Sequence, residues 1–418
     1  MKYMQLAWRN IGRNRRRTVL SITAVMIASM AVLLLFGLIT GMMENMAQNL
    51  IDYYVGEVRI RNAEYEPYEH LDPLHLSVAN VREVLTTVTD LPETRSAVPR
   101  ISTGGVVFRG EERIGLLITG VDFARERSFS GLEDILVAGE IPTGAPTTPA
   151  DGPRLIPAVV GTGVLDRLEV ELGDQFTVMS RTALRGSNAM SFQVVGIADF
   201  PVPAINESGF WAPLSDVQRM LRMDNQASQV LVKLNDRVDP VEATARISAA
   251  LDGVSNPMQI QYWKDIETTY AMLDFARTMY NFMGLILFVL ASTVIINTTM
   301  MAIFERKQEI GTLAAMGMTP GGLIRLFVTE ATILAMLGTV AGLILGGVIG
   351  GILGKVGINL TDAMEGVDYE LSNILYPHIR GVSVIFVFFA STIVGSLASL
   401  MPTSRIARIQ PVEALRDE

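Results

Sequence analysis

The side chains that most often do chemistry in proteins are scarce in this sequence. The chain has no cysteine, so thiol catalysis, disulfide bonds and cysteine-ligated metal are excluded. Its three histidines are His70, His75 and His378. His70 and His75 lie close enough in sequence to share a metal ion, but polar residues in a surface loop are the simpler interpretation. We therefore predict no metal site.

Motifs for nucleotide binding and hydrolysis are also missing. The nearest approach to a phosphate-binding loop is residues 349–356, IGGILGKV. This stretch lacks the first glycine of G-x-x-x-x-G-K-[ST] and the Ser or Thr after Lys355, and it ends an apolar segment instead of following a strand. No H-E-x-x-H or G-x-S-x-G motif occurs. We expect no enzyme and no cofactor on this chain, although motif absence leaves serine–lysine or carboxylate chemistry open.

The composition is that of a membrane protein. Of the 418 residues, 49% are hydrophobic and 18% charged, and the mean hydropathy is +0.34. Stretches without any Asp, Glu, Lys or Arg cover residues 18–43, 278–304, 331–354 and 381–404. Each exceeds the roughly 20 apolar residues needed to cross a bilayer as a helix. The sequence predicts four transmembrane helices.

Charge places the parts of the chain relative to the membrane. Residues 1–17 hold Lys2 and five arginines but no acid, and can form an amphipathic helix at the inner face. Both termini are then cytoplasmic and residues 44–274 lie outside. This block has a net charge of −14, while the rest of the chain carries +5, so nucleic acid is a poor partner for it. A cleaved signal peptide is the alternative for the N-terminus, but the apolar run is too long for one.

The block between the first two helices predicts a mixed α+β domain. Short β-like runs occur at residues 57–61, 105–108, 114–119, 175–178, 192–197 and 230–234, and helical patterns near 78–88, 214–223 and 240–251. The first two membrane helices lack Gly or Pro where they leave the membrane, so both should continue outward as a stalk; ordinary linkers are the alternative. The predicted order is a basic segment (1–17), helix 1 (18–43), the outer domain with stalk ends (44–274), helix 2 (275–304), an inner loop (305–325), helix 3 (326–354), a short outer loop (355–380), helix 4 (381–404) and a cytoplasmic tail (405–418).

Two kinds of residue within the predicted membrane helices are candidates for a specific role, namely regularly spaced glycines and polar residues. Gly338, Gly342, Gly346 and Gly350 recur every four residues and predict a ridge along which another helix packs closely, in preference to a pore lining. Polar groups at membrane depth are functional candidates by default. We interpret Asn297 as an interhelical hydrogen-bond donor and Glu330 as a group near the interface, with transport of an ion as the alternative for both.

The inner loop predicts a short amphipathic helix. Ile310, Leu313 and Ala314 form an apolar stripe beside a charged start, Gly317 suits a helix end, and Thr319-Pro320 suits the start of the next helix. Such a helix at the inner face is a surface that a soluble partner could grip.

At this loop the sequence resembles the permeases of the MacB/FtsX and lipoprotein-releasing (LolC/LolE) type of ABC transporter. The resemblance rests on residues 305–318 (ERKQEIGTLAAMGM), 6–14 (LAWRNIGRN) and 411–416 (PVEALR), with weaker likeness at 159–174 and 194–197. It spans the chain in the right order. It implies a protein of the bacterial inner membrane with a large MacB-like domain in the periplasm. The ATPase-coupling residues it implies are Glu305, Arg306, Glu309, Ile310, Gly311, Leu313, Met316 and Gly317.

The resemblance also implies partners. ATP and Mg²⁺ would bind a separate, dimeric ATPase subunit, and a second permease, identical or paralogous, would complete the transporter in the lipid. The stalks would then move the outer domains without passing substrate through the bilayer. Residues 56–60 (GEVRI) look like the lipoprotein-releasing branch, which implies a lipoprotein or other hydrophobic substrate and a periplasmic acceptor or adaptor. The alternatives are an efflux or peptide-export permease of the MacB type and an FtsX-like regulator of a cell-wall hydrolase.

Overall fold

The computed structural model describes residues 15–109, 112–143, 154–305, 307–359 and 374–406. The chain divides into two compact units. The helical unit comprises Met1–Glu44, Phe275–Glu365 and Asn373–Glu418, and the sheet unit comprises Asn45–Asp274 and Gly366–Ser372. Predictions for residues 1–14, for Arg306, for residues 360–373 of the outer loop and for the tail from residue 407 lie outside the described residues.

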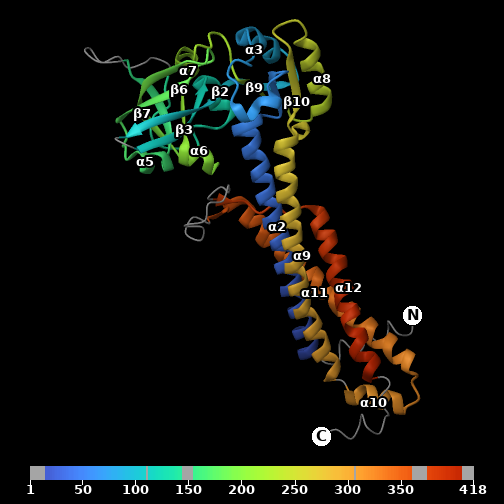
Figure 1. Cartoon of the computed structure of the whole chain (residues 1–418). Helices are drawn as coiled ribbons and strands as arrows, with labels where there is room; N and C mark the ends of the chain where they lie inside the picture. Colours follow the sequence, from blue (N-terminus) through green and yellow to red (C-terminus); the bar gives the residue numbers. More distant parts are fainter. Residues whose placement is uncertain (1–14, 110–111, 144–153, 306, 360–373, 407–418) are drawn as a thin grey trace. The chain divides into compact units, whose positions relative to one another are not determined.

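Four long helices supply most of the helical unit (Figure 1). All four are long and apolar enough to cross a membrane, which confirms the predicted number of spans. Their bounds are α2 Arg15–Leu50, α9 Glu267–Phe304, α11 Pro320–Val356 and α12 Gly381–Ile406. The short helix α10, Lys307–Ala315, lies between α9 and α11, and the two-residue strands β11 (Ile358–Asn359) and β12 (Ile374–Leu375) pair with each other.

Local chemistry sets the boundary between α10 and α11 where the sequence predicts it. Gly317 has φ +91°, a conformation that glycine adopts without steric cost, and the amide of Met318 donates to the carbonyl of Leu313 at 3.1 Å. Thr319 caps α11 by accepting from the amide of Gly322 at 3.2 Å, and Pro320 occupies the first turn. The predicted helix end and helix start are both confirmed.

The ends of α2 and α9 differ slightly from expectation. Helix α2 continues past Met43 to Leu50 and then forms one π-helical turn, η1 (Ile51–Val55), that stops at Gly56. Helix α9 begins at Glu267, after the 3₁₀ turn η3 (Trp263–Asp265), and so starts later than the predicted extension from Trp263. That these extensions act as a stalk stays a prediction.

The sheet unit is α+β, as predicted, and is built on one ten-stranded mixed sheet. The strands are β1 Val58–Asn62, β2 Thr94–Arg109, β3 Glu112–Val121, β4 Leu136–Gly139, β5 Ile156–Gly161, β6 Gln175–Arg181, β7 Ser187–Ala198, β8 Gly209–Pro213, β9 Gln229–Leu234 and β10 Met258–Tyr262. The helices are η2 Glu66–Leu71, α3 Val81–Thr89, α4 Phe123–Phe129, α5 Thr162–Leu168, α6 Pro203–Ser208, α7 Leu214–Leu221 and α8 Pro240–Ala250.

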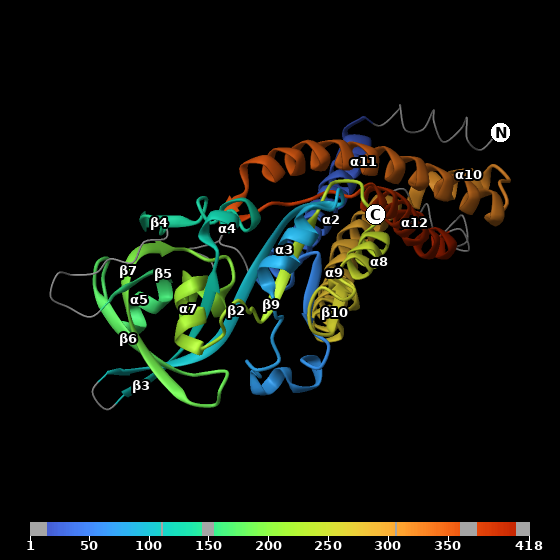
Figure 2. The ribbon, with the colours of Figure 1, turned by 90° about the horizontal axis from the view of Figure 1, so that it is seen from above.

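Strand β2 belongs to both halves of this sheet. Its first part pairs with β9, which continues to β1 and β10. Its second part pairs with β3 and β6, and the order β2-β3-β8-β5-β7-β6 returns to β2, so these strands close into a ring. Figure 2 shows α5 and α7 beside the curved strands of this ring. Apolar side chains from both halves form one large core, which includes Val58, Ile118, Phe210 and Val230.

Strands β1 and β10 connect the sheet to the two helices that flank it in sequence. β1 follows η1, and β10 precedes α9. We call α2 and η1 together, residues 15–55, the α2 segment. The two strands are antiparallel, with Val58 opposite Tyr262. Because these paired residues lie at the helix-proximal ends of both strands, the sheet holds the exit of α2 and the entry to α9 side by side within the sheet unit.

Candidate functional site

The short helix α10 packs on α11 with one apolar side. Ile310 is buried and belongs to a cluster with Leu323 and Phe327 of α11 and Ile303 of α9. Leu313 packs on the same cluster, and Gly311 is buried as well. A helix of nine residues is unstable alone. Burial of apolar surface contributes about 25 cal/mol per Å² to stability, so this packing is what keeps α10 in place.

Several residues of α10 and its flanks are more exposed. Met316 is 71% exposed, and Glu305 and Gly317 are also exposed, while Glu309 is half-buried. An exposed methionine next to charged groups is typical of an adaptable protein contact. The structure thus divides the predicted coupling residues into an anchoring set (Ile310, Gly311 and Leu313) and an outward set (Glu305, Glu309, Met316 and Gly317).

The glycines of α11 lie where the backbone of α2 approaches most closely. A Cβ on Gly338 would lie 2.9 Å from the carbonyl oxygen of Ile22, and one on Gly342 would lie 2.5 Å from that of Met26. Both distances are too short for a side chain, so only glycine fits. A Cβ on Gly346 would lie 3.2 Å from the side chain of Leu33 on α2. One on Gly350 would lie 2.3 Å from Ile379, in the segment before α12, and 3.4 Å from Leu34 of α2.

Hydroxyl groups join the same helices. Ser29 of α2 donates to Thr339 of α11 at 3.3 Å, and Thr332 of α11 lies 2.8 Å from Ser396 of α12. Of the polar residues singled out in the sequence, Glu330 is buried on α11 and Asn297 is exposed on α9. The hydroxyl pairs were not predicted, because serine and threonine in apolar helices carry no distinctive sequence signal.

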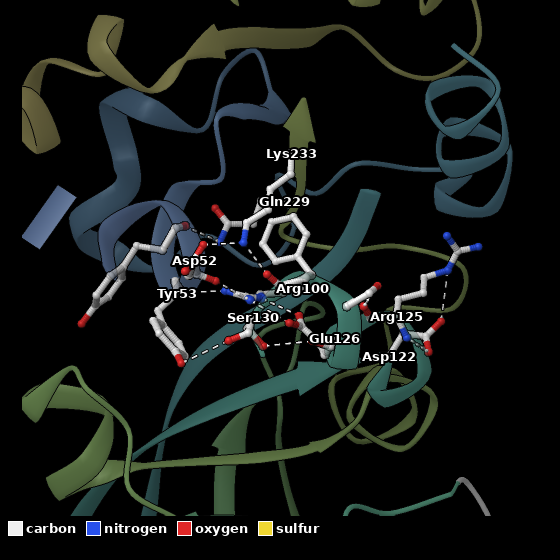
Figure 3. A network of polar contacts seen from close by, with 12 residues as sticks. Asp52, Tyr53, Arg100, Asp122, Arg125, Glu126, Ser130, Gln229 and Lys233 are labelled. Carbon is white, nitrogen blue, oxygen red and sulfur yellow. Dashed lines mark hydrogen bonds and ion pairs between the residues drawn. The ribbon is translucent and has the colours of Figure 1, made fainter. Parts of the chain in front are cut away.

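A buried ion pair lies beside the carboxyl end of the α2 segment (Figure 3). Arg100 of β2 and Glu126 of α4 are 1% and 0% exposed, respectively. Arg100 Nε donates to Glu126 Oε1 at 2.7 Å and Nη2 to Oε2 at 2.9 Å, a bidentate geometry. Asp122 caps α4 by accepting from the amides of Ala124 and Arg125, which fixes the helix that carries Glu126.

The remaining donors of Arg100 reach the main chain of η1. Nη1 donates to the carbonyl oxygen of Tyr53 at 2.6 Å, and Nη2 also donates to that of Asp52 at 2.8 Å. The guanidinium carbon lies 5.1 Å from the ring centre of Trp211 and 5.4 Å from that of Phe129. The last carbonyls of a helix have no partner within it and carry partial negative charge, so a buried cation is well placed there.

Strand β9 supplies the other half of this network. Gln229 Nε2 donates to the carbonyl oxygen of Tyr54 at 3.2 Å. Lys233 Nζ pairs with the carboxylate of Asp52 at 2.5 Å and donates to the carbonyl of Phe129. Three successive carbonyls, those of Asp52, Tyr53 and Tyr54, therefore accept hydrogen bonds from side chains of the sheet. In the sequence, Arg100 stands out as a charged residue directly after Ala97-Val98-Pro99. That position does not show which residues it contacts.

A second cluster of charges lies at the start of the sheet unit. Arg59 of β1 is buried, and its pKa is lowered to about 10, first by burial and then by the neighbouring Arg61. Burial alone would raise the pKa of Glu69, but Arg61, hydrogen-bonded to it at 2.5 Å, and Arg59 hold the pKa of Glu69 below its usual value. These charges tie η2 to β1.

Nothing in the described ranges resembles a metal centre. Among those residues, no group of three or more His, Asp or Glu side chains is placed to hold an ion. The side chain of His70 lies outside the described set, and His378 instead pairs with Glu44 of α2 at 3.1 Å, next to Arg380.

Comparison with known proteins gives the family. A model of the MacB-like periplasmic core domain matches residues 18–250, and a model of the FtsX-like permease C-terminal region matches residues 281–411. The chain is 23% identical over 347 residues to the lipoprotein-releasing system transmembrane protein LolC of Xylella fastidiosa, which covers 80% of each chain. It is 25% identical over 275 residues to the macrolide export ATP-binding/permease protein MacB 2 of Aeromonas hydrophila, covering 61% of this chain and 39% of that protein.

A crystal structure of the periplasmic region of MacB from Actinobacillus actinomycetemcomitans aligns with a TM-score of 0.35 and 16% identity, over 51% of this chain and 92% of that one. The two family models together account for both units, since one matches more than half of the chain and the other matches the part that carries α10, α11 and α12. The family resemblance predicted from the inner loop is thereby confirmed. The chain belongs to the MacB/FtsX type of ABC transporter permeases.

Proposed function

We propose that this permease drives the release of lipoproteins from the inner membrane, powered by a separate ATPase subunit that grips α10. The likeness to LolC extends over four-fifths of both chains, whereas the likeness to MacB 2 covers 39% of that protein, and this difference supports the lipoprotein-releasing branch. A second permease, identical or paralogous, completes the transporter. ATP and Mg²⁺ bind to the partner ATPase.

One observation carries the coupling step. Helix α10 is anchored on α11 through Ile310, Leu323 and Phe327, and α11 in turn packs closely on the backbone of α2 at Gly338 and Gly342. A displacement of α10 by the ATPase therefore has a continuous set of packed contacts from the inner helix to α2. Because close-packed interfaces deform little, this set of contacts passes movement on instead of absorbing it.

The outward residue Met316 tests the ATPase contact. Replacing Met316 with Asp puts a charge where we expect an apolar contact, so the ATPase subunit should no longer co-purify with the permease. Met179 on β6 is a matched control, because it is also an exposed methionine but belongs to the sheet unit. Equal retention of the ATPase by Met316→Asp and Met179→Asp would contradict the proposal.

The substrate class is tested on the intact complex. Mass spectrometry of the complex purified from its native membrane should identify an ATPase, one or two permeases and an acylated protein. Depletion of the chain should then leave lipoproteins in the inner membrane. A co-purifying periplasmic adaptor without acylated protein would instead favour efflux of the MacB type, and a co-purifying cell-wall hydrolase would favour an FtsX-like regulator.

A further inference from the structure

We infer that Arg100, Glu126 and Gln229 form a rigid joint that fixes the end of the α2 segment to the sheet, so that movement of this segment moves the sheet as one body. The inference rests on the proposed function and deepens it, because it names positioning residues for the transmission of movement. None of the three contacts α10 or lies in a membrane-spanning helix. They act through the backbone of η1.

The end of the α2 segment is hydrogen-bonded to side chains of the sheet. A helix is ordinarily finished by a cap from its own neighbouring residues. Here the carbonyls of Asp52, Tyr53 and Tyr54 accept from Arg100 and Gln229, which belong to β2 and β9, about 50 and 175 residues further along the chain. The helix end is thus bonded to two neighbouring strands of the sheet, and it cannot shift along its axis without breaking these bonds.

The guanidinium group of Arg100 is held in a fixed position. The guanidinium of Arg100 is planar and presents its donors in a fixed arrangement. Glu126 holds two of these donors from one side, and the rings of Trp211 and Phe129 lie 5.1 and 5.4 Å from the guanidinium carbon. With Arg100 1% exposed, water does not compete for its donors. The side chain therefore has one position, set by the sheet and by α4.

The Arg100–Glu126 pair also bears on the stability of the fold. A buried ion pair is often no more stabilising than apolar residues of similar size, because both charges lose their hydration. Fold stability alone therefore does not explain this pair. Apolar replacements would fill the same space but could not bond to the carbonyls of Asp52 and Tyr53. The distinctive contribution of the pair is the fixed connection between sheet and helix end.

Replacing both Arg100 and Glu126 by apolar residues tests whether the pair transmits movement or only stabilises the fold. The double variant Arg100→Met with Glu126→Leu keeps the volume and loses both carbonyl bonds. The matched control is Arg154→Met with Asp216→Leu, which removes an ion pair of the same unit, 3.0 Å between Nη2 and Oδ1, that joins the residues before β5 to α7. Both variants are assembled with the ATPase in lipid nanodiscs, and only those with a normal melting temperature are compared.

Spin labels report the joint directly. The chain has no cysteine, so Met46→Cys on α2 and Glu83→Cys on α3 provide one label pair in each copy of the chain, within the sheet unit. Electron paramagnetic resonance should give one narrow distance distribution for the wild type and the control, with and without ATP. For the Arg100/Glu126 variant we expect a broad distribution that changes with ATP. Transport per ATP should fall about tenfold while ATP hydrolysis continues.

The outcomes are distinct. If the Arg100/Glu126 variant keeps the narrow distribution and the wild-type transport per ATP, the joint is wrong while the proposed function stands. If the wild-type complex itself shows no ATP-driven transport, the proposed function fails, and the label distances still show whether the helix end is fixed to the sheet. If the variant broadens but transport is unchanged, the joint is not needed for transmission and the inference is overturned.

Discussion

Arg100 donates to both carboxylate oxygens of Glu126 in the interior of the sheet unit, while it also donates to the main-chain carbonyls of Asp52 and Tyr53. The two charges depend on each other for their stability in the fold. Removing one partner leaves an uncompensated buried charge, whereas removing both does not.

This dependence predicts a difference between single and double variants. Glu126→Leu alone should lower the free energy of unfolding of the sheet unit by about 3 to 5 kcal/mol, because the charge of Arg100 then lacks its partner. Adding Arg100→Met should restore most of that loss. Chemical unfolding of the full chain in detergent measures both values, and a double variant less stable than Glu126→Leu would contradict the assignment.

The glycines of α11 predict a contrast between two neighbouring positions. Gly342→Leu places a side chain against the carbonyl of Met26, 2.5 Å from the new Cβ, and overpacking of this kind costs about 1 to 3 kcal/mol or more. Gly347→Leu is the control, because nothing lies within 4 Å of a Cβ there. The melting temperature of the purified permease should fall only for Gly342→Leu. Equal effects at both positions would argue against the close approach of α2 and α11.

Gly56 terminates the π-helical turn in a conformation that other residues avoid. Its φ is +65°, and a Cβ would lie 2.9 Å from the amide nitrogen of Val232 on β9. Gly56→Ala should therefore destabilise the fold by about 1 to 3 kcal/mol. Gly104→Ala on β2 is the control, since no atom lies within 4 Å of its Cβ and its φ is not positive. Thermal unfolding measures both, and a neutral Gly56→Ala would show that the turn can relax.

Glu69 predicts a dependence of stability on acid pH. Its pKa in the folded chain lies below its usual value because Arg61 and Arg59 outweigh the effect of burial. A carboxyl group whose pKa is lowered by folding stabilises the fold above its unfolded pKa, and this contribution is lost as the pH falls through the folded pKa. Glu69→Gln should flatten the fall in melting temperature below about pH 4.5. An unchanged pH profile would show that the Arg61 pair contributes nothing to stability.

The sequence predicted the elements whose patterns are local. The helical patterns near residues 78–88, 214–223 and 240–251 correspond to α3, α7 and α8, and the membrane helices are recognisable from uncharged runs alone. Strands β5 and β8 were not predicted, because all residues of both are buried and the alternation that marks a half-buried strand is absent.

The two sites also differ in whether local sequence patterns predict them. Helix α10 was predicted because its apolar stripe, Gly317 and Thr319-Pro320 are neighbours in sequence. The network around Arg100 was not, because its members come from α4, β2, β9 and η1 and meet only when the sheet forms. Periodicity in one segment carries no information on such long-range pairing.

The role of α10 in coupling is tested most directly by comparing ATP hydrolysis and transport in the same proteoliposomes, with wild-type permease and with Glu309→Lys on α10. We expect the variant to insert into the membrane and to retain its fold, and its partner ATPase to hydrolyse ATP while transport is lost. Wild-type transport per ATP in Glu309→Lys would contradict the claim that α10 conveys the work of the ATPase to the rest of the chain.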